Sequence, residues 1–150
     1  MQRHEKNFKA ISKMVYKSLK DFNYFCQEIS GITLRKYQRG PAQAILKSVI
    51  SEAGRSFVVM FPRQSGKNEL QAQIETYLLI LYHLLNAEMV KVSPTWKPQT
   101  LNAMRRLERV LEKNKITHTW WERESGYIFR LGCARIYFFS GQPRANIAVS

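Results

Sequence analysis

Apolar residues recur along this chain with two different periods, which predicts an alternation of helices and strands. Near the N-terminus the steps are three and four residues, the spacing that gives a helix one buried face: Phe8, Ile11, Val15, Leu19 and Phe22. We expect an amphipathic helix over residues 6–28, ended by Gly31. A second helix is expected after residues 32–41 and before Gly54, with four apolar residues on one face: Ile45, Leu46, Val49 and Ile50.

The middle of the chain predicts a buried strand, a polar turn and a long helix in direct succession. Residues 57–61 form a short apolar run, FVVMF, and the turn PRQSGK follows it. A largely apolar stretch from Glu69 to about Asn86 then predicts the helix. This order is that of a phosphate-binding P-loop, in which backbone N–H groups and the positive end of the helix hold an anion.

The second half predicts three more strands and one helix. A short strand is expected at residues 89–92, a helix from residue 98 to about Asn114, and two strands at residues 127–131 and 134–139 joined by a turn at Gly132. Such alternation, with a P-loop after the first core strand, predicts an α/β fold in which a parallel sheet is flanked by helices. Its ligand is expected at the carboxyl ends of the strands. The late hairpin can extend the sheet in the antiparallel sense.

The predicted P-loop departs from the general pattern G-x-x-x-x-G-K-[ST] at both ends, where Phe61 and Asn68 stand. Gly66 still allows a close backbone approach to phosphate, and the amide oxygen of Asn68 can take the magnesium position. The alternative is a glycine turn that only begins a helix. ATP hydrolysis also needs an acidic pair after a second apolar strand, and no such pair is present in residues 1–150.

Charge points to a polyanionic partner. A net charge of +13 and a pI near 10.0 suit nucleic acid, because each neutralised phosphate releases a counterion. The expected third helix has four basic residues opposite its apolar face: Arg105, Arg106, Arg109 and Lys113. These residues either contact the DNA phosphate backbone or simply form a solvated surface. The longest uncharged apolar run, residues 77–85, is too short to span a bilayer. We therefore expect no membrane partner.

Four segments in this order resemble the ATPase domain of large terminase subunits of tailed bacteriophages. They are LRKYQ at 34–38, PRQSGKN at 62–68, VSPTWKPQ at 92–99 and FFSGQPRAN at 138–146. The Arg-Gln-x-Gly-Lys form of the P-loop is the most specific of them. The resemblance covers residues 34–150 and implies the front part of an ATPase domain of the P-loop NTPase (RecA-like, ASCE) type. Residues 1–33 are then an N-terminal helical segment.

The resemblance implies ATP and Mg²⁺ as cofactors, with Asn68 at the magnesium position. Arg63 and Lys67 would be catalytic, because Arg63 can stabilise charge developing on the transferred phosphoryl group; the alternative is a surface arginine. Gln38 would recognise the adenine edge, or is simply a polar residue at a helix start. The implied ATP-binding residues are Tyr37, Gln38, Pro62, Arg63, Gln64, Ser65, Gly66, Lys67 and Asn68.

By this resemblance the chain is part of a motor that couples ATP hydrolysis to translocation of double-stranded DNA into a capsid. Expected partners are a small terminase subunit, the portal protein and other copies in a ring, in the cytoplasm of an infected bacterial host. The acidic strand and a nuclease domain would lie beyond residue 150. The alternatives are a helicase-like, nucleic-acid-stimulated ATPase, which shares the P-loop and the Ser-Pro-Thr element at 93–95, and a non-catalytic basic DNA-binding fragment.

Overall fold

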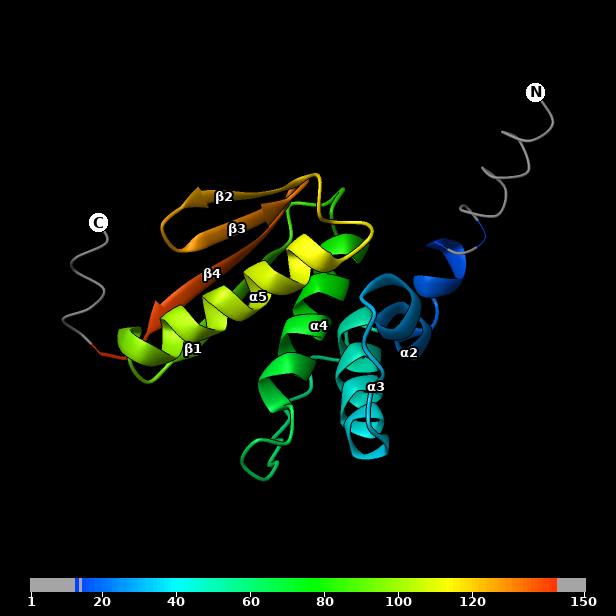
Figure 1. Ribbon diagram of the computed structural model, residues 1–150, viewed down its shortest axis with the longest axis horizontal. Helices are drawn as coiled ribbons and strands as arrows, with labels where there is room; N and C mark the ends of the chain where they lie inside the picture. The colour runs from blue at the N-terminus through cyan, green and yellow to red at the C-terminus, as the bar shows by residue number, and fades with distance from the viewer. Residues whose placement is uncertain (1–12, 14, 143–150) are drawn as a thin grey trace. The chain divides into compact units, whose positions relative to one another are not determined.

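The structure, a computed structural model, describes residues 13 and 15–142 and divides the chain into two compact units. The division falls between Met60 and Phe61, whereas the sequence suggested a boundary after residue 33. The described part of the first unit is helical (Figure 1). The second unit contains a four-stranded sheet with helices, so the chain is of the α/β class.

The predicted N-terminal helix is interrupted at Asp21 in its described part. Residues 15–18 are helical, and after a turn the chain continues as α2 (Phe22–Tyr24) and a π-helical turn, η1 (Phe25–Ile29). Asp21 is extended, and its Oδ1 accepts a hydrogen bond from the Tyr24 backbone N–H at 3.1 Å. A single helix was therefore the wrong prediction, because aspartate caps a helix start better than it fills an interior. The remainder of the predicted helix, residues 6–12 and 14, lies outside the described residues.

The second predicted helix is present as α3 (Lys36–Ile50), but it begins within residues 32–41, the segment that was expected to precede it. Ala42 and Leu46 are buried along it, while Val49 and Ile50 at its end are exposed. The predicted apolar face is therefore covered only in part.

The predicted strand at residues 57–61 is absent, which corrects the sequence interpretation. The described chain has no strand between α3 and α4, and the side chains of Val58 and Met60 are 92% and 88% exposed. Valine and aromatic residues favour strands only where neighbouring strands supply ladder hydrogen bonds and packing. An apolar run of five residues therefore does not make a strand by itself.

The sheet has the strand order β1-β4-β3-β2. Its strands are β1 (Glu88–Ser93), β2 (Trp121–Ser125), β3 (Ile128–Leu131) and β4 (Ala134–Ser140). Only β1 and β4 are parallel, and the other two pairings are antiparallel. The sheet is therefore mixed and mostly antiparallel, so the predicted parallel sheet is not confirmed, whereas the predicted antiparallel hairpin is present as β3 and β4. Within it β1 is an edge strand on which Val90 and Val92 are each 62% exposed.

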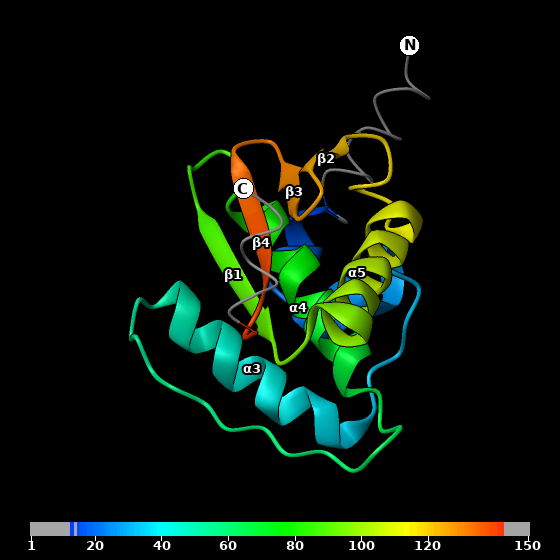
Figure 2. The ribbon, with the colours of Figure 1, turned by 90° about the vertical axis from the view of Figure 1, so that its left-hand side faces the viewer.

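Three helical segments lie against one face of this sheet (Figure 2). They are α4 (Lys67–Leu81), a π-helical turn η2 (Trp96–Thr100) and α5 (Leu101–Lys113). Burial alternates along β4, so that Ile136 and Phe138 point into the core, where Leu79 of α4 and Leu107 of α5 are also fully buried. Helices packed on alternating strand residues are what an α/β layer requires.

A buried ion pair joins α4 to the edge strand. Lys91 Nζ lies 2.6 Å from Glu75 Oε1, and the two side chains are only 17% and 14% exposed. Burial raises the pKa of the Glu75 carboxyl, while the charge and hydrogen bond of Lys91 oppose that rise. Glu75 Oε2 has no hydrogen-bond partner among the described residues. The charge of Glu75 therefore depends on Lys91 alone.

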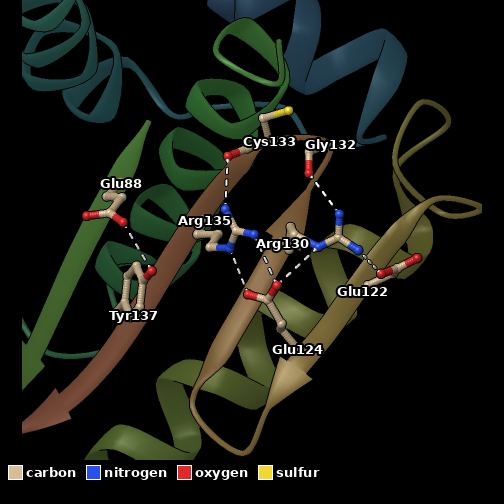
Figure 3. A network of polar contacts seen from close by, with 8 residues as sticks. All are labelled: Glu88, Glu122, Glu124, Arg130, Gly132, Cys133, Arg135 and Tyr137. Atoms are coloured by element: carbon tan, nitrogen blue, oxygen red, sulfur yellow. Dashed lines mark hydrogen bonds and ion pairs between the residues drawn. The ribbon is translucent and has the colours of Figure 1, made fainter. Parts of the chain in front are cut away.

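Strand β2 was missed because its residues are mostly charged and exposed. Figure 3 shows how it is held: Glu124 binds Arg135 of β4 through two hydrogen bonds of 2.7 and 3.1 Å, and Arg130 of β3 contacts both Glu122 and Glu124. The hydrogen bond from Arg135 is the main cause of a pKa of Glu124 below its usual value. Cross-strand charge pairs of this kind fix the pairing of an otherwise polar strand.

Position 132, in the predicted turn between β3 and β4, requires glycine both for its backbone conformation and for lack of space around it. Its φ is +60°, and a Cβ placed on it would lie 2.5 Å from the backbone oxygen of His83. We expect Gly132→Ala to destabilise the protein by about 1–3 kcal/mol from backbone strain, with the steric contact adding to it. Chemical denaturation measures this loss. Gly126→Ala is the matched control, because its Cβ would meet no atom within 4 Å; an equal loss in both variants would contradict this explanation.

Candidate phosphate-binding site

The turn at residues 62–66 bends sharply before α4. Gln64 has φ +58°, and Gly66, the N-cap of α4, is left-handed with φ +80° and ψ +19°. A positive φ is uncommon outside glycine and costs free energy. Two such residues within three positions bring the chain round so that α4 starts immediately after Gly66. A turn and a helix therefore stand where the sequence predicted them, without the strand before them, and the P-loop itself stays a prediction.

The N-terminus of α4 leaves backbone donors for an anion. Gly66 has no side chain with which to cap this helix, and the first N–H groups of any α-helix lack partners within it. Lys67 is the first helical residue and Asn68 the second, and both are exposed. Arg63 is exposed in the turn, and neither Arg63 nor Lys67 forms an ion pair with any described residue. Exposed cations next to the first N–H groups of a helix attract phosphate.

This helix start lies at the same end of the second unit as the ends of the two parallel strands (Figures 1 and 2). The turn of residues 82–87 reverses the chain between α4 and β1, so the beginning of α4 and the end of β1 are at the same end of the unit, as Figures 1 and 2 show. Ser93 and Ser140 pair at the ends of β1 and β4, and the Gly141 N–H donates to the Ser93 carbonyl at 2.8 Å. Ligands of α/β sheets bind at this carboxyl edge.

The predicted Ser-Pro-Thr element follows β1 at that edge. Thr95 donates from its backbone N–H and its hydroxyl to Gln99 Oε1, each at 3.1 Å, and its carbonyl accepts from the Thr100 hydroxyl at 2.9 Å. These bonds hold η2, the turn that directly precedes α5. They do not test the resemblance of this element to one in helicase-like ATPases.

Of the four basic residues predicted on α5, three share one exposed stripe. Arg105, Arg109 and Lys113 follow each other at four-residue steps and are exposed. Arg106 is turned away from them, toward α4, where its Nη1 lies 2.9 Å from Glu69 Oε2. The sequence spacing predicted all four basic residues on one face of the helix. It did not indicate the ion pair, because Arg106 and Glu69 are 37 positions apart.

The predicted adenine-binding residues lie in the first unit. Gln38 is buried at the start of α3, and its Oε1 accepts a hydrogen bond from the Arg35 backbone N–H at 2.9 Å. Tyr37 is exposed, and its hydroxyl accepts from Arg35 Nη1 at 2.8 Å. Gln38 is thus a polar residue at a helix start, which was the alternative interpretation of this residue. Adenine recognition by Tyr37 and Gln38 stays a prediction.

The fit to magnesium is weaker than the fit to phosphate. Among the described residues no three His, Cys, Asp or Glu side chains gather as a metal site. Asn68 alone offers a side-chain oxygen at the start of α4, because the nearby Glu69 carboxylate is already engaged with Arg106 and Gln73. Magnesium would therefore have to arrive with the phosphates as its main ligands.

Comparisons with known proteins add no relative. No family model matches this chain, and no match was found among curated proteins or solved structures. Within residues 13 and 15–142, no helix combines the length and apolar character needed to cross a membrane.

Proposed function

We propose that this chain is the nucleotide-binding portion of a viral DNA-packaging ATPase of the large terminase type. The observation that carries the proposal is the start of α4: a helix that follows a left-handed glycine and begins with an exposed lysine, which forms no ion pair with the described residues. That arrangement favours a polyphosphate over other ligands, because the first N–H groups of α4 and two exposed cations, Arg63 and Lys67, lie within a few positions of one another along the chain. The four sequence segments support the choice of family.

In this proposal each residue of the turn has a separate task. The first backbone N–H groups of α4 hold the phosphate chain, Lys67 neutralises its charge, and Arg63 reaches the outermost phosphate. ATP supplies the transferable phosphoryl group. The described residues contain no acidic pair at the ends of β1 and β4, where Ser93 and Ser140 stand. We therefore expect this chain alone to bind nucleotide and to hydrolyse it poorly.

Calorimetric titration with ATP, pyrophosphate and AMP tests the nucleotide half of the proposal. A cradle for phosphates binds ATP and pyrophosphate and takes up AMP poorly, because AMP carries a single phosphate. Equal affinity for all three ligands, or none for any, would show that residues 62–68 do not form the proposed site.

DNA binding is expected to depend on the exposed stripe of α5. Arg105→Glu with Arg109→Glu should weaken binding to double-stranded DNA at least about tenfold and lower the salt slope, since each phosphate contact contributes roughly one unit to it. Fluorescence anisotropy over a range of salt concentrations measures both quantities. Lys36→Glu with Lys47→Glu on α3 changes the net charge equally and serves as control. An unaltered slope in the α5 variant would place the DNA contacts elsewhere.

A second candidate is a basic DNA-binding domain that takes no nucleotide. The absence of a strand before the turn favours it, because a P-loop is normally anchored by such a strand. The two candidates differ in one measurement, since only the first predicts ATP binding that requires Lys67.

A further inference from the structure

Glu69 is the acidic residue nearest in sequence to the proposed phosphate site, two positions after Lys67 in the first turn of α4. A carboxylate there stabilises the helix, because it lies near the positive end of the macrodipole. The same charge repels a phosphate bound at that end. A helix start that holds polyphosphate therefore requires this charge to be offset.

Two side chains engage the Glu69 carboxylate from different elements. Its Oε2 lies 2.9 Å from Arg106 Nη1 of α5, and its Oε1 accepts a hydrogen bond from Gln73 Nε2 at 3.2 Å. Gln73 is fully buried and lies one turn further along α4. Its bond draws the carboxylate along the helix, away from Gly66, while Arg106 neutralises it.

We propose that Arg106 is a positioning residue of the phosphate site, which acts by offsetting the charge of Glu69. This inference rests on the proposed function of residues 62–68. It separates Arg106 from the exposed stripe of Arg105, Arg109 and Lys113: those charges face outward and are available to DNA, whereas Arg106 serves the nucleotide end of α4.

Three variants test the inference by calorimetry with ATP and with inorganic tripolyphosphate. Arg106→Gln exposes the Glu69 charge and should weaken binding about 3- to 10-fold, and Glu69→Gln should strengthen it by a similar factor because Arg106 is then unopposed. The double variant should return close to the unmodified affinity. All these differences should shrink at high salt. A packing role alone does not predict that Glu69→Gln binds more tightly.

Glu112→Gln is the matched control, because it removes an exposed carboxylate of α5 and changes the net charge by the same amount. Its affinity should be unchanged, and thermal unfolding shows that each variant is folded at the titration temperature. Unchanged or weaker binding by Glu69→Gln, together with binding that still requires Lys67, would overturn this inference and leave the proposed function intact. No Lys67-dependent binding by the unmodified chain would overturn both.

Discussion

Replacing Lys67 by alanine is expected to lower the affinity for ATP by about 100-fold, because a charge-assisted contact contributes up to about 3 kcal/mol. Lys67 is exposed at the first position of α4 and forms no ion pair with the described residues. Its removal should therefore leave the free energy of unfolding almost unchanged. Calorimetry measures the affinity, and chemical denaturation measures the stability.

Lys115→Ala provides the matched control for this experiment. Lys115 is also exposed and lies after the end of α5, so its removal changes the net charge equally without touching residues 62–68. ATP affinity should stay within about twofold in the control, because Lys115 lies outside residues 62–68 and salt largely screens the charge of an exposed side chain. Equal ATP affinities of the Lys67 and Lys115 variants would show that Lys67 is not part of the proposed phosphate site.

The largest expected loss of stability comes from Lys91→Met, at about 3–5 kcal/mol, because it leaves the buried Glu75 carboxylate without its cation. Lys91 Nζ is 2.6 Å from Glu75 Oε1, and Glu75 Oε2 has no other partner among the described residues. Methionine keeps most of the apolar volume of the lysine stem. Chemical denaturation at neutral pH measures the effect.

The loss caused by Lys91→Met should depend on pH in a defined direction. Burial raises the pKa of Glu75, and loss of Lys91 raises it further, so the folded state binds the proton more tightly than the unfolded chain. Stability then falls as the pH rises above the ordinary value of 4.5, and the loss is smallest near pH 4.

Glu75→Leu combined with Lys91→Met should recover most of the stability, because an apolar pair replaces a buried ion pair at little cost. A loss in Lys91→Met that is the same at pH 4 and pH 7, or that the double variant does not relieve, would show that the damage comes from packing alone.

Helices and strands with strong internal patterns were predictable from the sequence. Helix α5 has apolar residues at helical spacing, and β4 alternates between buried and half-buried positions, so each carries its own signal. Strand β2 has no such pattern of apolar residues. Instead, Glu122 and Glu124 bind arginines of β3 and β4 and so hold the strand to the sheet. Cross-strand charge pairs link residues that are distant in sequence, and local periodicity does not contain them.

The candidate site, too, was predictable only where its features follow from local sequence. The turn before Lys67 and the helix after it follow from local sequence, since Gly66 supplies the left-handed conformation that starts α4. The strand at residues 57–61 was inferred from composition, but a strand forms only where a neighbour completes its hydrogen bonds. The pairing of Glu69 with Arg106 depends on how α4 packs against α5, which spacing along the chain does not reveal.

The exposed valines of β1 also bear on how the protein behaves at high concentration. An edge strand with Val90 and Val92 uncovered is a template on which another molecule can add its own backbone, the first step toward aggregation. The charge of +13 opposes that step, because like-charged molecules repel one another. Salt screens this repulsion. Stock solutions should consequently remain clear longest at low ionic strength and become turbid as salt is added.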